Sequence, residues 1–175
     1  MVLNDILKGK VAVVTGACGG IGKAICERLA QDGVKLALVD IDQAHLRSMA
    51  ASFDVETIVS VVDGSDPEAV TKEYDVISRE LAPTDILVNC AGILSNSKLL
   101  ATSPEEWRNV IAVNLDSAFY WSKVVVPGMQ ERRFGRIINI SSLAWKAGGI
   151  TAGTAYTASK GGMVSLTFSI AREFA

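Results

Sequence analysis

The fold is decided by the segment Lys10-Val11-Ala12-Val13-Val14-Thr15-Gly16-Ala17-Cys18-Gly19-Gly20-Ile21-Gly22. Its first half is continuously apolar, which is typical of a strand that is buried on both faces of a parallel sheet. A glycine-rich turn follows, and from Ile21 to Gln31 apolar and charged residues recur at helical spacing. A strand, a glycine turn and a helix in direct succession predict the first unit of an α/β fold.

The same alternation continues along the rest of the chain. Further strands are predicted at 34–39, 56–62, 85–90 and 136–140, helices at 42–53, 66–81, 103–133 (with a break) and 155–175, and a loop at 143–154. This rhythm predicts a doubly wound parallel sheet, the Rossmann type, with strand order 3-2-1-4-5. We expect residues 1–175 to form a single domain of this type.

The doubly wound order also requires a sixth strand beside the fifth, and the sequence reaches Ala175 without one. A shortened polypeptide, a disordered remainder and a naturally short chain would each explain this. We expect the domain to be incomplete at its C-terminus, and the 175-residue chain alone to have little or no turnover.

Composition excludes several classes of protein. Of the 175 residues, 49% are hydrophobic and 21% charged, with a net charge of −2, which suits a packed core and gives no basic footprint for nucleic acid. No apolar stretch reaches the roughly 18 residues of a membrane span, and the first residues lack a secretory pattern, so a cytoplasmic protein is expected. Three cysteines and one histidine, His45, predict neither a disulfide framework nor a metal site. His45 is expected on an exposed helix face.

The glycine turn has the features of a phosphate-binding site. Gly16 permits the tight turn, Gly20 lets the backbone approach a pyrophosphate, and Gly22 allows the helix to pack closely on the sheet. The helix N-terminus offers unpaired N–H groups and a positive dipole end. Cys18 and Ile21 lie in the same turn and are expected to border the nucleotide. The alternative interpretation is a plain tight turn.

Asp40 ends the second predicted strand, close to the ~20 residues after the glycines at which a carboxylate binds a ribose 2′-hydroxyl. A carboxylate repels a 2′-phosphate, and no Arg or Lys occupies 17–21 or 39–44. The sequence therefore favours NAD(H) over NADP(H). Alternatively, Asp40 caps the next helix, although Asp42 is better placed for that.

Four further motifs follow the glycine turn in order. They are Asn89-Cys90-Ala91-Gly92, Asn114 within Val113-Asn114-Leu115, Ile138-Asn139-Ile140-Ser141-Ser142, and Tyr156-Thr157-Ala158-Ser159-Lys160. Together with Thr15–Gly22 they resemble the motifs of the short-chain dehydrogenase/reductase family over almost the whole chain. The resemblance implies hydride transfer between a nicotinamide nucleotide and a carbonyl or alcohol carbon.

The resemblance also implies residue roles. Asn114, Ser142, Tyr156 and Lys160 are the expected catalytic residues. The expected cofactor-binding residues are Gly16, Cys18, Gly20, Ile21, Gly22, Asp40, Asp63, Asn89, Ala91, Gly92, Tyr156 and Lys160. Tyr156 and Lys160 share one helix face, so the ammonium can stabilise the phenolate of a general acid/base. The serine would polarise the substrate oxygen, and the asparagine would anchor a water that relays protons.

Several of these assignments have alternatives. Asp63 could be a turn residue, Asn114 a satisfied polar group within its helix, and Cys18 and Cys90 small packing residues. Cys90 replaces an asparagine of the family motif, and the serine-to-tyrosine separation is one residue longer than usual. Ser142 is preferred to Ser141 because it lies nearer the usual spacing.

The resemblance leaves the substrate open between a 3-oxoacyl-carrier-protein reductase, whose members more often prefer NADPH, and a sugar or polyol dehydrogenase. A nucleotide-binding fragment without catalysis is the alternative from another class. Family members are commonly homotetramers or dimers that share helices equivalent to 105–133 and 155–175. The stripe Ala112, Leu115, Phe119 and Ser122 is expected to be exposed, as such a bundle requires.

Overall fold

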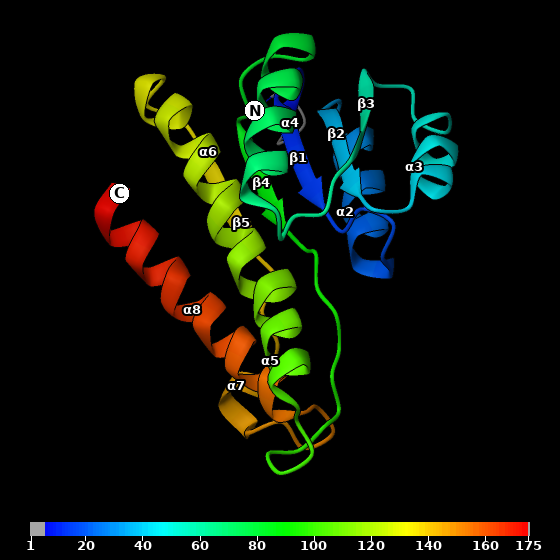
Figure 1. The fold of residues 1–175 in the computed structure, drawn as a ribbon. Helices are drawn as coiled ribbons and strands as arrows, with labels where there is room; N and C mark the ends of the chain where they lie inside the picture. The colour runs from blue at the N-terminus through cyan, green and yellow to red at the C-terminus, as the bar shows by residue number, and fades with distance from the viewer. Residues whose placement is uncertain (1–5, 175) are drawn as a thin grey trace.

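The computed structural model describes residues 6–174 and contains a five-stranded parallel sheet in the order β3-β2-β1-β4-β5 (Figure 1). The strands are β1 (Val11–Thr15), β2 (Lys35–Asp40), β3 (Thr57–Val61), β4 (Ile86–Asn89) and β5 (Arg136–Asn139). The helices are α2 (Gly20–Gln31), α3 (Gln43–Ala50), α4 (Pro67–Glu80), α5 (Pro104–Ile111), the π-helical turn η1 (Ala112–Asp116), α6 (Ser117–Glu131), α7 (Ala144–Ala147) and α8 (Thr154–Phe174). The predicted doubly wound sheet and its strand order are confirmed.

Helices cover both faces of the sheet, and β1 contributes to both cores. Val13 packs in one cluster with Trp121 and side chains of α4, whereas Val14 packs in another with Cys26 and side chains of α3. Every residue of β1 is buried. A continuously apolar strand is what a position between two helical layers requires.

Three helices begin with a side-chain cap, among them Asp42, which the sequence favours as a cap over Asp40. The Asp42 side chain accepts a hydrogen bond from His45 N, Asp66 accepts from Glu68 N and Ala69 N, and Ser103 accepts from Glu106 N. Pro67 and Pro104 occupy the first helical positions of α4 and α5. These caps satisfy N–H groups that have no partner inside their helices. His45 is exposed, as expected.

Three local predictions were wrong. The break expected in 103–133 is the turn η1, which keeps the helix continuous. The 143–154 loop contains α7, whose first amide, that of Ala144, donates to Ser142 Oγ at 3.2 Å. Ser122 is only 2% exposed because its hydroxyl accepts from the buried Asn89, so it does not belong to an exposed stripe.

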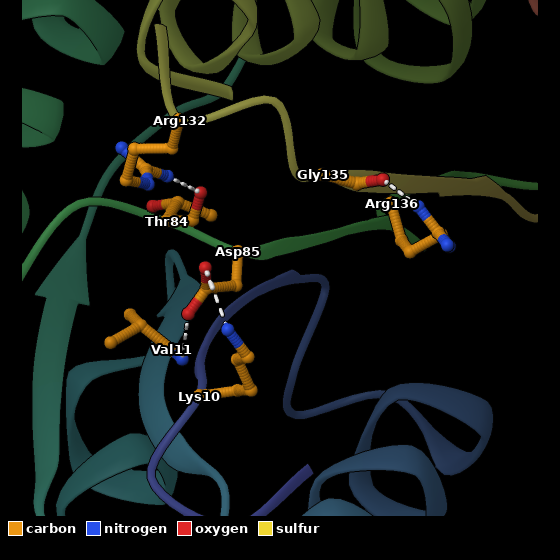
Figure 2. Close-up of polar contacts among 7 residues, drawn as sticks. All are labelled: Lys10, Val11, Thr84, Asp85, Arg132, Gly135 and Arg136. Carbon is orange, nitrogen blue, oxygen red and sulfur yellow. Dashed lines mark hydrogen bonds and ion pairs between the residues drawn. The ribbon is translucent and has the colours of Figure 1, made fainter. Parts of the chain in front are cut away.

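Polar contacts around Asp85 close the amino-terminal edge of the sheet (Figure 2). Its Oδ2 accepts from Val11 N at 3.1 Å, and its Oδ1 lies 3.7 Å from Lys10 Nζ. Nearby, Arg132 Nη2 donates to Thr84 O at 2.7 Å. These contacts hold the start of β1, the segment before β4 and the end of α6 together at the sheet edge opposite the glycine turn.

At one side of the sheet, β5 pairs with β4 and, over residues 6–174, with no other strand. Ile138 on β5 is 47% exposed, whereas strands β1 and β4 are buried throughout. Within the same described range, no helix combines the length and apolarity needed to cross a membrane.

Candidate active site

Two glycines of the turn after β1 have no room for a side chain. Gly16 has φ +65°, and a Cβ there would lie 2.7 Å from Ala91 Cα. A Cβ on Gly22 would overlap the carbonyl oxygen of Gly16. Gly16 therefore holds the turn against the loop after β4, and Gly22 holds α2 against the turn, in agreement with their predicted roles.

Gly20 differs, because a Cβ there would meet nothing within 4 Å. It is the first residue of α2, whose N-terminus receives no side-chain cap, and the neighbouring Ile21 is 59% exposed. The turn thus leaves open space beside the backbone of residue 20, at the positive end of a 12-residue helix, and we call this open face of the turn the cradle. This geometry fits the pyrophosphate of a dinucleotide.

Asp40 lies at the end of β2, beside the glycine turn. Its Oδ2 accepts from Cys18 N at 3.0 Å, and its Oδ1 accepts from Ile41 N at 2.8 Å and Asp42 N at 3.3 Å. A carboxylate has about four acceptor sites, so one on Oδ2 stays available for a ribose hydroxyl. The N-cap of α3 is Asp42. The alternative interpretation, in which Asp40 caps this helix, therefore does not apply.

Cys18 takes part in this arrangement through its backbone. Burial, and then the charge of Asp40, raise the pKa of its thiol to about 11. The thiol is therefore neutral near pH 7, which suits a small packing residue at the rim of the cradle.

The turn after β4 is tied to β1 by Thr15, a residue to which no role was assigned from sequence. Thr15 Oγ1 accepts from both Cys90 N and Ala91 N at 3.1 Å. A Cβ on Gly92 would lie 3.3 Å from Asn114 Oδ1 and 3.4 Å from Lys160 Nζ. The sequence feature that could have indicated this role is the position of Thr15 at the end of β1, opposite the end of β4 in the predicted strand order.

Two expected cofactor contacts have other partners in the structure. Asn89 is 2% exposed, and its Nδ2 donates to Asn139 Oδ1 at 2.8 Å, which joins β4 to β5. Asp63 Oδ1 accepts from the amide and the hydroxyl of Ser65 at 2.9 and 2.7 Å, the turn role given as its alternative. Contact of either residue with a cofactor stays a prediction.

Asn114 lies fully buried in η1, where it connects three segments. Its Oδ1 accepts from Ile93 N at 2.7 Å, and its Nδ2 donates to Ile93 O and to Ser159 Oγ, both at 3.0 Å. The amide is thus a satisfied polar group, as the alternative interpretation held, and it fixes the loop after β4 against α8.

The two serines after β5 have different partners. Ser141 Oγ donates to the carbonyl of Lys160 at 2.8 Å, which ties the end of β5 to α8. Ser142 Oγ accepts from Ala144 N, so its own proton is free for another acceptor. The preference for Ser142 over Ser141 as the residue facing a substrate agrees with this difference.

Lys160 is the buried cation of the site. It is 4% exposed, and its Nζ donates to Ile140 O at 2.8 Å and lies 5.8 Å from the centroid of the Tyr156 ring. Burial lowers the pKa of its ammonium, an effect that the nearby Cys90 partly offsets. Strands β4 and β5, η1 and α8 therefore bring Asn114, Tyr156 and Lys160 together at the carboxyl edge of the sheet, and Ser142 follows the end of β5 at the same edge.

Known proteins share this architecture and these motifs. The 3-oxoacyl-[acyl-carrier-protein] reductase FabG of Vibrio cholerae is 39% identical over 170 residues, covering 97% of this chain and 69% of that protein. An acetoacetyl-CoA reductase of Allochromatium vinosum is 38% identical, covering 94% of this chain and 68% of that protein. The chain thus spans about two thirds of the length of these relatives.

The crystal structure of an NAD+-bound xylitol dehydrogenase superposes with a TM-score of 0.91 at 33% identity, covering 96% of this chain and 66% of that one. The model of the family described as short chain dehydrogenase matches residues 10–175. On this evidence, the chain belongs to the short-chain dehydrogenase/reductase family of oxidoreductases.

Proposed function

We propose that this protein uses NAD(H) to interconvert a carbonyl group and a secondary alcohol. The observation that carries the proposal is the buried Lys160 beside Tyr156 at the carboxyl edge of the sheet. Among the described residues Lys160 has no carboxylate partner, and a buried cation of this kind is costly. Buried ionisable groups with shifted pKa values cluster at functional sites. When bound, the nicotinamide supplies or accepts the hydride.

The residues of the chain would then hold and move the protons. The Ser142 hydroxyl would donate a hydrogen bond, without losing its proton, to the substrate oxygen on which negative charge develops. Tyr156 gives its phenolic proton to the same oxygen during reduction and takes it back during oxidation, while the Lys160 ammonium stabilises the phenolate. Asn114 holds the loop after β4 against α8 through Ile93 and Ser159, and from that position it would anchor a relay water.

The preference for NAD(H) rests on Asp40. Its carboxylate is fixed by three backbone amides beside the cradle and keeps an acceptor site for a ribose 2′-hydroxyl. The NAD+-bound state of the xylitol dehydrogenase supports this preference. A 2′-phosphate at the same place would be repelled.

For the substrate, we favour a 3-oxoacyl thioester, because the relatives named above as reductases act on such groups and are 38–39% identical. A polyol is the second candidate, supported by the 33% identical xylitol dehydrogenase. Acetoacetyl-CoA with NADH and xylitol with NAD+ are the corresponding probes.

The first test is a fluorescence titration with NADH and, in parallel, NADPH. Tighter binding of NADH is expected, and Asp40→Asn should reduce the difference between the two. Tighter binding of NADPH by the wild-type chain would contradict the Asp40 argument.

The second test compares variants in turnover, here and below in the native polypeptide, because the 175 residues alone are expected to have little or no turnover. Ser142→Ala and Tyr156→Phe should lose turnover and keep NADH affinity, whereas Ser141→Ala should keep most of its turnover. A chain that binds NADH but turns over neither probe would support the alternative of a nucleotide-binding fragment without catalysis.

We also propose that the protein forms a homodimer or homotetramer through the faces of α5, α6 and α8. Phe119 on α6 and Phe168 on α8 are 45% and 71% exposed, and apolar surface on these helices is what a contact between subunits would cover. Light scattering after size exclusion would measure the mass; a monomer would refute this part.

A further inference from the structure

The segment 93–102, which we call the crossing segment, runs from β4 to α5 past the start of α8 (Figure 1). It is anchored near its start. Ile93 is bonded through its backbone to Asn114, and the Ser95 hydroxyl donates to Glu106 on α5. Hydrogen bonds from Ser95 and then Ser97 lower the pKa of Glu106, so this carboxylate stays charged and accepting.

The crossing segment pairs directly with the residues that begin α8. Gly153 N donates to Ser95 O at 2.6 Å, and Thr154 N donates to Ser97 O at 3.0 Å. A Cβ on Gly153 would lie 2.5 Å from Ser97 O and 2.8 Å from Ser95 O. The two backbones are therefore in contact two residues before Tyr156.

Lys98 holds the remainder of the loop that leads into α8. Its Nζ donates to Gly149 O at 2.7 Å, Ala152 O at 2.6 Å and Ile150 O at 3.3 Å. An ammonium has three donors, and all three are used on carbonyls of a single loop. The loop 149–152 is thus wrapped around one cation.

The loop turns at two successive glycines and packs against the start of α8. Gly148 and Gly149 have φ of +71° and +67°, a conformation that glycine adopts without steric cost. A Cβ on Gly149 would overlap Thr157 Oγ1, so its backbone rests on the residue that follows Tyr156. A shift of this loop would therefore be passed to the start of α8.

From these contacts we propose that Lys98 is a positioning residue: by binding three carbonyls of 149–152, it fixes the loop between Ser142 and Tyr156 and so sets the placement of the tyrosine. The inference rests on the proposed function, because it is that function which assigns Tyr156 a role in proton transfer. A displacement of about 1 Å at a reacting group lowers turnover by up to about a hundredfold.

The test uses Lys98→Met, which keeps the side-chain length and removes the donors, with Lys98→Arg as the conservative variant. The exposed Lys72 on α4 provides the matched control, Lys72→Met. Hydrogen–deuterium exchange of 148–157 measures how often the backbone amides of the loop open to solvent, and it requires no substrate. Turnover of acetoacetyl-CoA, the NADH dissociation constant and the melting temperature are measured on the same samples.

In Lys98→Met we expect exchange in 148–157 to rise at least about tenfold and kcat to fall about tenfold to a hundredfold. NADH affinity should not change, Lys98→Arg should restore part of kcat, and Lys72→Met should match the wild type. Unchanged exchange in Lys98→Met overturns the proposal, and so does an equal loss of kcat and NADH affinity, which indicates general unfolding. If Lys98→Met does not fold, Lys98→Gln is judged by the same criteria.

Absence of turnover in the wild type would count against the proposed function. The exchange data would still decide whether Lys98 fixes the loop.

Discussion

Replacing Gly20 by alanine separates the cradle for the nucleotide from the stability of the fold. A Cβ at residue 20 meets no protein atom within 4 Å, so the variant should fold without strain. Glycine in a helix is less stable than alanine by roughly 0.5–1 kcal/mol, and Gly20→Ala should therefore unfold at equal or higher urea concentration. Its methyl group nevertheless occupies the space in which the pyrophosphate would approach the backbone.

We expect NADH to bind Gly20→Ala at least about tenfold more weakly, a loss of about 1.4 kcal/mol. Gly22→Ala should behave differently, because its Cβ overlaps Gly16 O. Relieving a backbone overlap costs about 1–3 kcal/mol of stability, so this variant should lose both folding free energy and affinity. Gly128→Ala, whose Cβ would lie 3.1 Å from Arg132 Nη1 and 3.8 Å from the Tyr74 hydroxyl, is the control outside the site.

The assays are NADH fluorescence titration and urea unfolding of the same preparations. An unchanged NADH dissociation constant in Gly20→Ala would refute the assignment of Gly20 to the pyrophosphate. A loss of stability in Gly20→Ala would show that the residue is confined by the protein itself.

Three further predictions concern other parts of the molecule. Asp85→Ala should lower the free energy of unfolding by roughly 1–3 kcal/mol, because Val11 N loses its acceptor, and should leave NADH affinity unchanged at the far edge of the sheet; altered affinity would contradict this. Lys160 has a lowered pKa in the folded chain, so the unfolded chain binds more protons between that value and 10.5. The free energy of unfolding should therefore rise with pH across this window, and the rise should be missing in Lys160→Met. The pKa of about 11 at Cys18, against an ordinary 9.0, predicts alkylation by iodoacetamide at pH 8 about a hundredfold slower than for a free cysteine, and faster in Asp40→Asn; rapid labelling of the wild type would show that Asp40 and burial do not suppress the thiolate.

The sheet and its order could be predicted because each strand carries its own signal. The apolar run of β1 and the glycines after it can be read locally, and so can the Asp66-Pro67 and Ser103-Pro104 helix starts. The roles of Gly16 and Gly22 follow from how a strand turns into a helix, which also needs no knowledge of distant residues.

What could not be predicted depends on contacts between distant segments. The predicted strand order places β1 beside β4, but it does not indicate that the Thr15 hydroxyl accepts from the amides of 90–91. Lys98 meets 149–152 only because α8 starts beside the crossing segment. Asn89 has the sequence position of a cofactor contact, yet its side chain joins β5. An exposed lysine in a loop gives no pattern from which three carbonyl partners could be inferred.

The π-helical turn η1 also fixes the rotational phase between α5 and α6. Each residue of an α-helix advances the helix by about 100° of rotation. A π-helical turn holds one extra residue, so the residues after it keep the orientation that they would otherwise lose by that rotation. Deleting a residue from 112–116 would therefore turn the whole of α6 about its axis. Trp121 and Val125, which are fully buried against the sheet, would move away from it, although no residue of α6 had been changed.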